Sequence, residues 1–253
     1  MDPMNADHLV AAMTDVQRQL NAHIPGSRLL RKDGAAAWIT GIPYPAFNHV
    51  LLERANPPVS AVAALLDEAA DAGVPVTLGL RPGSDPLLAG LAAARGMKAH
   101  GNLPLMVLDA KAGIGGIRRA RGLDIRQLAP HEAPEHTRVA AAAFGGPEQM
   151  FMPSPDLMRV DGLRCYLGEV DGRPVATAIG VTTGAFTAVF SVATDPAFRH
   201  RGFGTAVTAR AAADGVLAGA AWCWLQATSD GYPVYRNLGF RTVETWSQWL
   251  SGS

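Results

Sequence analysis

The chain has 253 residues, of which 48% are hydrophobic and 17% are charged. This length predicts one or two domains, and the high apolar content at zero net charge excludes a disordered chain. Lysine and arginine together number 22, as do aspartate and glutamate, which argues against a nucleic-acid binder or a protein of anionic membrane surfaces.

Export and membrane insertion are not favoured by the sequence. The first residues include acidic side chains and lack the basic and continuous apolar regions of a secretory signal. The uncharged stretch 174–194 could cross a bilayer, but Thr182, Thr183 and Gly184 in its middle favour a β-hairpin. We therefore expect a cytoplasmic protein. Two cysteines, Cys165 and Cys223, are too few for a disulfide scaffold, and we expect both in the core.

Helices and strands alternate in the first half of the chain. The expected elements are a helix over 6–21, strands over 35–40 and 49–53, a helix over 60–72, a strand over 74–80, a helix over 85–95 and a strand over 103–108. Ser60 is the expected N-cap of the second helix, and Gly73 its stop. Asp85 and Gly96 bound the third helix in the same way.

A Gly- and Arg-rich segment over 111–122 separates the two halves and reads as a linker, with a nucleic-acid tail as the alternative. The second half alternates like the first, with a tight turn at Asp171 and Gly172. Its expected elements are a strand over 123–128, a helix over 131–144, a hairpin of 163–169 with 174–181, a strand over 185–194, a helix over 203–217, a strand over 222–228, a short helix over 233–238 and a terminal strand or strand pair over 240–250. The class is mixed α/β with a central sheet.

One loop has the features of a diphosphate site. Downstream of a β-branched strand it leads into a helix, and Gly202 and Gly204 stand at the junction. Glycines allow a ligand to approach the backbone, and the first N–H groups of a helix have no internal partner. Arg199, His200 and Arg201 add positive charge. The alternative is that the Gly-x-Gly pattern serves only a tight turn and close packing.

The spacing in this loop differs from two other phosphate-binding motifs. It is not GxxxxGK[ST], which excludes a P-loop NTPase, and it is not GxGxxG with an acid about 20 residues on, which disfavours a dinucleotide site. Instead, Arg199-x-x-Gly202-x-Gly204 is followed, after one strand, by the run Tyr-Arg-Asn-Leu-Gly-Phe over 235–240. This order of motifs resembles the GNAT superfamily of acyl-CoA-dependent N-acyltransferases. The resemblance covers about residues 123–250, where the first motif is similar to the pyrophosphate loop of that family.

The resemblance implies acetyl-CoA as the co-substrate. Backbone N–H groups of 201–206 would hold its pyrophosphate, residues 192–194 would pair with its pantetheine arm, and an N–H near Val192 would polarise the thioester carbonyl. Thr228 stands where the family often has Asn, so this contact departs from the family pattern. The implied binding residues are Val192, Ala193, Thr194, Arg199, His200, Arg201, Gly202, Phe203, Gly204, Thr205, Ala206, Thr228 and Ser229.

Tyr235 is implied as the general acid that protonates the departing thiolate, because a phenol holds its proton at neutral pH. The alternative is a packing aromatic. The strands over 185–194 and 222–228 contain no carboxylate for a base, which leaves Glu169 and Glu244 as candidates, each otherwise a solvated strand residue. The expected acceptor is a small-molecule amine, with a peptide or protein amine second. The expected assembly is a monomer or homodimer without a metal. The rival function is a non-catalytic acyl-CoA-binding sensor or assembly module, and another phosphate-ligand enzyme is a third.

Two further segments have ambiguous side chains. His131 and His136 are five residues apart with Pro134 between them, so they do not form the zinc-protease pattern. Met150 to Pro153 either lines a substrate pocket or belongs to the core.

Residues 59–108 repeat the order of elements in 205–250, without the phosphate loop. The corresponding position holds Arg-Ala-Asn-Pro-Pro over 54–58, where proline removes N–H donors. We therefore expect two GNAT-like domains, each a mixed, mostly antiparallel sheet flanked by helices. Residues 1–110 would be a degenerate domain that is structural or forms a wall of the acceptor pocket, 111–122 the linker, and 123–253 the catalytic domain. An unrelated N-terminal α/β domain is the alternative.

Overall fold

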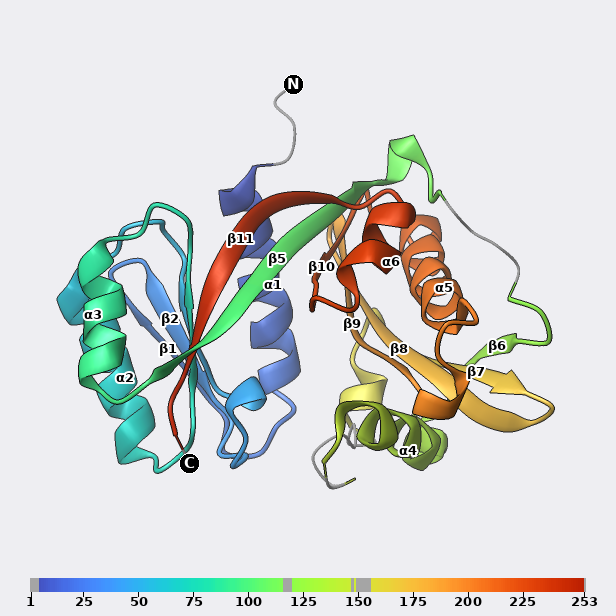
Figure 1. Cartoon of the computed structure of the whole chain (residues 1–253), viewed down its shortest axis with the longest axis horizontal. Helices are drawn as coiled ribbons and strands as arrows, with labels where there is room; N and C mark the ends of the chain where they lie inside the picture. Colours follow the sequence, from blue (N-terminus) through green and yellow to red (C-terminus); the bar gives the residue numbers. More distant parts are fainter. Residues whose placement is uncertain (1–4, 116–119, 147, 149–155, 253) are drawn as a thin grey trace. The chain divides into compact units, whose positions relative to one another are not determined.

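The computed structural model describes residues 5–115, 120–146, 148 and 156–252 (Figure 1). Met150 to Pro153 and part of the expected linker lie outside these residues. The chain forms two compact units. Unit 1 comprises Met1–Leu105 with Val243–Ser253, and unit 2 comprises Met106–Thr242. The last residues of the chain thus group with unit 1, although the sequence analysis assigned them to the C-terminal domain.

Unit 1 is a mixed sheet in the order β1-β2-β3-β4-β11. Its pairs are antiparallel except β3 with β4, which are parallel and joined by the crossover helix α2. Its helices are α1 (Ala6–Asn21), α2 (Val59–Asp71) and α3 (Pro86–Ala94). Its strands are β1 (Arg28–Lys32), β2 (Ala35–Ile39), β3 (His49–Leu52), β4 (Thr77–Leu80), the first part of β5 (Lys98–Asp109) and most of β11 (Arg241–Leu250).

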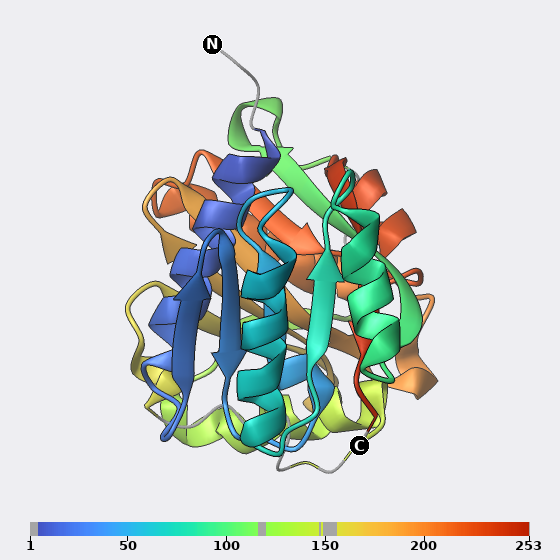
Figure 2. The same ribbon diagram turned by 90° about the vertical axis from the view of Figure 1, so that its left-hand side faces the viewer.

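Helices cover both faces of the unit 1 sheet. α2 and α3 lie on one face and α1 on the other (Figure 1), and Figure 2 shows α2 and α3 in front of the strands. Both faces of β2 are therefore covered, and all five of its residues are buried. Val62 and Leu65 of α2 pack with Ala37 and Ile39 of β2 in the core.

Unit 2 has the strand order β10-β9-β8-β7-β6 and repeats this plan. Its pairs are antiparallel except β9 with β10, which are parallel and joined by the crossover helix α5. Its strands are β6 (Asp124–Gln127), β7 (Leu163–Val170), β8 (Arg173–Thr183), β9 (Phe186–Thr194) and β10 (Trp222–Gln226). Its helices are α4 (Ala133–Phe144), α5 (Phe203–Leu217) and α6 (Tyr232–Asn237).

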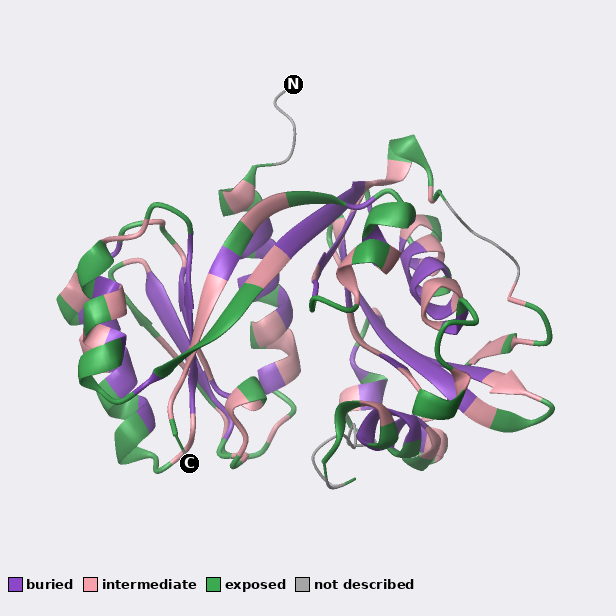
Figure 3. Ribbon diagram, in the orientation of Figure 1, coloured by how far each residue is buried: buried purple, intermediate pink, exposed green. Residues whose placement is uncertain are grey.

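The core of unit 2 lies between the sheet and helices α5 and α6, while α4 packs on the other face. Met106 and Leu108, from the second part of β5, belong to this core. Figure 3 shows the buried residues on the faces of strands and helices that meet within each unit. The predicted class, a mixed and mostly antiparallel sheet flanked by helices, is confirmed.

Local chain signals explain most element boundaries. Asp171 and Gly172 have φ values of 51° and 74°, as a tight hairpin turn requires, and they join β7 to β8. The 174–194 stretch is therefore strand, and no helix in the described part of the chain is long and apolar enough to cross a membrane. Asp85 caps α3, accepting from the Leu87 N–H at 2.8 Å.

Some predicted features were wrong or incomplete. α2 begins at Val59 with Pro58 at its N-cap, so Ser60 is not the cap. β1 was not predicted, and β5 starts five residues earlier than expected, at Lys98.

Cys165 and Cys223 are buried and free, as expected, and burial raises the pKa of the Cys165 thiol to about 12.

Candidate functional site

Strand β9 leaves its parallel neighbour β10 after the first third of its length. The pairing runs from Phe186 with Trp222 to Ala188 with Trp224. β9 then continues for six residues, to Thr194, while its other edge still pairs with β8. Backbone N–H and C=O groups on the β10 side of this strand end can therefore pair with an extended ligand.

A β-bulge lies within this open part of β9. Ile179 pairs with Phe190 and Thr177 with Ala193, so two residues of β9 stand opposite one of β8. Ser191, inside the bulge, has a φ of 51°. A bulge leaves a residue out of the ladder and re-aims the neighbouring groups. The bulge could not be predicted, because Ser191 stands in an ordinary β-branched run.

The loop after β9 forms the predicted glycine junction. His200 and Gly202 both have positive φ, 62° and 81°. Gly202 is the N-cap of α5 and makes no side-chain cap bond, and the first intrahelical bond runs from the Ala206 N–H to the Gly202 carbonyl at 3.0 Å. The N–H groups of the first turn, at Phe203 to Thr205, therefore have no acceptor within the helix.

Gly204 allows α5 to lie against the end of β9. A Cβ at this position would stand 3.3 Å from Oγ1 of Thr194, which is tighter than most such contacts. In the same turn, the Thr208 hydroxyl donates to the Gly204 carbonyl at 2.8 Å. The second glycine of the motif therefore has a packing role as well as leaving room above the helix end.

The basic side chains of the loop have different partners. Arg199 donates to the Ala143 carbonyl at 2.9 Å and to the Thr194 carbonyl at 3.4 Å, so it ties the loop to α4 and β9. Arg201 lies over the ring of Phe198 at 5.0 Å, and Arg173 lies over the same ring at 4.8 Å. The structure thus adds Phe198 and Arg173 to the loop, neither of which was predicted.

Tyr235 lies on α6 with its ring against Gly231. A Cβ on Gly231 would come within 2.8 Å of the Tyr235 ring, and Phe240 contacts the ring edge-on at 6.1 Å between centroids. The side chain is buried, and burial raises its pKa to about 12. Its phenol therefore keeps its proton over the whole physiological range.

Thr228 and Ser229 follow β10 and are exposed. The Thr228 hydroxyl accepts from the Gly231 N–H at 3.2 Å, and its carbonyl accepts from the Tyr232 N–H at 2.9 Å. Thr228 therefore organises the turn that leads into the Tyr235 helix.

The two predicted base candidates are engaged elsewhere. Glu169 lies on β7, two strands from β9, and accepts from Nε of Arg126 at 2.8 Å. Arg126 also donates to Glu132 at 2.7 Å. Glu244 belongs to unit 1, where it accepts two hydrogen bonds from Arg81.

The histidine pair His131 and His136 does not share a helix. Pro134 stands in the first turn of α4, which begins at Ala133, so His131 precedes the helix. Across the residues that the structure describes, no three His, Cys, Asp or Glu side chains gather as a metal site.

Residues 161–242 match the family model described as the acetyltransferase (GNAT) domain. No curated protein matches the chain. Its fold is similar to a GCN5-related N-acetyltransferase from Kribbella flavida, with a TM-score of 0.74 and 20% identity over 99% of this chain and 97% of that one. A GCN5-related N-acetyltransferase from Sphaerobacter thermophilus has a TM-score of 0.66 and 15% identity over 98% of this chain and 93% of that one.

A tandem GNAT protein from the clavulanic acid biosynthesis pathway is similar over 98% of this chain and 95% of its own length, with a TM-score of 0.59 and 15% identity. The fold likeness thus extends over both units, while the matched family model lies within unit 2. The diverging strands, the glycine junction and Tyr235 all lie within residues 161–242. These residues belong to unit 2, so the similarity to the acetyltransferase (GNAT) domain lies in that unit.

Proposed function

We propose that unit 2 transfers the acyl group of acetyl-CoA to a primary amine by direct attack. The observation that carries the proposal is the course of β9: its free edge passes the bulge at Ser191 and ends at Thr194, where a short loop leads into the glycine junction of α5. A thioester, an extended pantetheine arm and a diphosphate follow one another in the same order along acetyl-CoA.

The residues present fit the diphosphate of CoA. The N–H groups at Phe203, Gly204 and Thr205 have no intrahelical acceptor, and no side chain caps the helix at Gly202. Arg201 adds positive charge beside them. Val192 to Thr194 offer backbone groups on the β10 side of β9 for the pantetheine arm.

The chemistry follows from these positions. The amine nitrogen attacks the thioester carbon, and a backbone N–H near Val192 stabilises the negative charge that develops on the carbonyl oxygen. The carbon–sulfur bond breaks, and the Tyr235 hydroxyl gives its proton to the departing thiolate. The nitrogen, positively charged after the attack, loses a proton to water, and solvent restores the proton of Tyr235. The attacking nitrogen must lose a proton first, because an alkyl ammonium has a pKa near 10. The sequence predicts Glu169 as the base for this step, but its carboxylate is paired with Arg126, so we expect solvent to take the proton.

A second function is favoured by one observation. In the described strands β9 and β10, no residue is a carboxylate that could serve as a base. A non-catalytic acyl-CoA-binding module would need the loop and not the base.

The net charge of the chain is zero, so its electrostatic field does not attract a strongly charged acceptor. We therefore propose a small-molecule amine as the first acceptor and a peptide or protein amine as the second.

We infer that unit 1 is a degenerate GNAT-like domain. It repeats the order of unit 2, with antiparallel strands, a crossover helix, a parallel strand and a short helix. β3 ends at Leu52, one residue beyond its last pair with β4, so it has no long free end like that of β9. Pro57 and Pro58 replace the glycine junction before α2. Acetyl-CoA therefore has its site in unit 2 alone.

The test is a calorimetric titration of the full chain with acetyl-CoA, beside Gly204→Glu. The added carboxylate should repel the diphosphate and abolish micromolar binding. Gly90→Glu is the matched control, because Gly90 lies within α3 with open space around it. Loss of binding in Gly204→Glu alone supports the site. A wild type that does not bind acetyl-CoA overturns it, and binding without transfer to any amine of a broad panel favours the binding module.

A further inference from the structure

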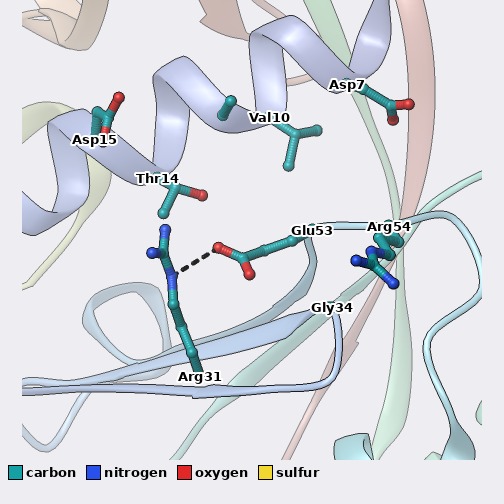
Figure 4. Close-up of a pocket in the computed structure, with 9 residues that line it drawn as sticks. Asp7, Val10, Thr14, Asp15, Arg31, Gly34, Glu53 and Arg54 are labelled. Carbon is teal, nitrogen blue, oxygen red and sulfur yellow. Dashed lines mark ion pairs between the residues drawn. The ribbon is translucent and has the colours of Figure 1, made fainter.

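Unit 1 contains a pocket that the proposed transfer reaction does not use. It lies between α1, the β1–β2 hairpin and the residues that follow β3, and its volume is about 350 Å³ (Figure 4). Pockets of about 300–1,000 Å³ that combine apolar walls with a few polar groups are typical of small-molecule sites. Val10 and Ala11 of α1 supply the apolar wall.

A buried hydroxyl without a partner lines this pocket. Thr14 is 1% exposed, and among the described residues no group hydrogen-bonds to its Oγ1. Figure 4 shows its side chain extending from α1 toward Glu53 and Arg31. Buried polar atoms are almost always paired, and one left unpaired lowers stability. A hydroxyl kept unpaired at the wall of a pocket is therefore available to a ligand.

The charged groups around Thr14 are of both signs. Arg31 contacts Oε1 of Glu53 through Nε at 2.9 Å (Figure 4), and the Glu53 side chain is partly buried. Arg54 stands on the other side of the pocket, and the structure gives its guanidinium no ion-pair or hydrogen-bond partner within the described ranges. Its methylene groups lie over Gly34, where a Cβ would come within 2.9 Å of Cδ, so only glycine leaves room for this side chain.

We propose that this pocket binds a small zwitterion, with one ammonium and one carboxylate on a short aliphatic body, as in a free α-amino acid. Glu53 receives the ammonium and Arg54 the carboxylate. The Thr14 hydroxyl hydrogen-bonds the charged end of the ligand, which carries the ammonium and the carboxylate. Val10 and Ala11 contact the aliphatic part. Asp7 and Asp15 line the pocket as well, so its acids outnumber its arginines and an anion alone is disfavoured. The proposal does not depend on acyl transfer.

The probe is L-valine, compared with its two halves. Isobutylamine keeps the ammonium and isovalerate keeps the carboxylate. In amide NMR spectra of the full chain, valine should shift the signals of Thr14, Gly34 and Glu53, and each half should bind at least about tenfold more weakly. Valine that shifts none of these signals up to about 10 mM, or half-probes that bind as well as valine, overturns the proposal.

Thr14→Val removes the hydroxyl at nearly constant volume. It should abolish the valine shifts while leaving the unfolding free energy of the unliganded chain unchanged or higher, because the hydroxyl has no partner to lose. Thr137→Val is the matched control, since Thr137 is also fully buried in a helix and donates to the Ala133 carbonyl at 3.1 Å. Valine binding that survives in Thr14→Val contradicts the proposal.

A second variant tests whether Arg54 binds the carboxylate of the ligand. Arg54→Gln should weaken valine at least about tenfold and leave isobutylamine unchanged. Arg95→Gln, at an exposed α3 end where Arg95 bonds Asp67, should change neither. Equal loss of valine and isobutylamine in Arg54→Gln would assign Arg54 a structural role and overturn the assignment.

Discussion

The guanidinium of Arg81 donates two hydrogen bonds to the carboxylate of Glu244, 2.9 Å from Nε and 2.8 Å from Nη2. Arg81 is 4% exposed, and it also contacts the Asp7 carboxylate at 2.7 Å and the Glu53 carbonyl at 3.2 Å. Trp246 donates its indole N–H to Glu244 at 2.8 Å. Glu244, a base candidate from the sequence, is thus the counter-ion of a buried arginine in unit 1.

Removing this arginine should destabilise the chain strongly. Arg81→Met leaves the partly buried Glu244 without its main partner, and breaking a buried ion pair on one side costs up to about 3–5 kcal/mol. Arg95→Met, which breaks the more exposed pair with Asp67, should cost less than about 1 kcal/mol. Urea unfolding followed by tryptophan fluorescence measures both. Equal losses in the two variants would mean that the Arg81 pair is as weak as a surface one.

Tyr235→Phe should separate catalysis from binding. Without the phenol proton the leaving thiolate is not protonated, so kcat should fall by about 10²-fold or more while the affinity for acetyl-CoA stays within about threefold. Tyr232→Phe is the control on the same helix, because the Tyr232 hydroxyl accepts a long hydrogen bond from the Thr242 hydroxyl, at 3.5 Å. Steady-state kinetics measure kcat, and calorimetry measures the affinity for acetyl-CoA. An unchanged kcat in Tyr235→Phe removes Tyr235 as the acid.

The raised pKa of Tyr235 also predicts how stability responds to alkali. Burial raises the pKa to about 12 in the folded chain, above the value near 10 of an unfolded tyrosine. The unfolded chain therefore loses this proton first, and the stability contributed below pH 10 is lost between about pH 10 and 12. At pH 11 the wild type should have lost about 1.4 kcal/mol more than Tyr235→Phe, relative to pH 8. Parallel pH dependences of the two unfolding free energies would contradict this.

Glu169→Gln tests the remaining base candidate. Its carboxylate is paired with Arg126 on the β6–β7 side of the sheet, so we expect kcat to fall less than about threefold, with proton removal left to solvent. Glu132→Gln, which removes the other partner of Arg126, should behave alike. A loss of more than about tenfold in Glu169→Gln alone would make Glu169 the base.

Much of the fold could be predicted because local signals were strong. The helix over 203–217 has the predicted ends, and Asp171 with Gly172 made the predicted hairpin turn. β1 was missed because its sequence, Arg-Leu-Leu-Arg-Lys, is polar at an edge of the sheet. The partner of β11 could not be predicted either, since no local pattern shows which distant strand it pairs with.

The site was predicted through its loop and its tyrosine, which stand in short motifs. The bulge at Ser191 had no such signal, because bulges depend on the register between strands rather than on the residue itself. Phe198 looked like an ordinary loop aromatic, and only the structure brings Arg173 and Arg201 to its ring. The positions of the two base candidates, away from the loop, could not be predicted either. Each carboxylate is held by an arginine that is distant in sequence.

The pairing of β11 with β4 decides when this protein can finish folding. Leu80 and Thr77 pair with Ser247 and Leu250, so the sheet of unit 1 is completed only after the whole of unit 2 has been synthesised. At about 5–20 residues per second, β4 waits roughly ten to thirty seconds with an open edge. An unpaired strand edge is an aggregation risk. A nascent chain of this protein should therefore depend on chaperones that shield its N-terminal half, and cutting the gene between the halves should yield two incomplete products.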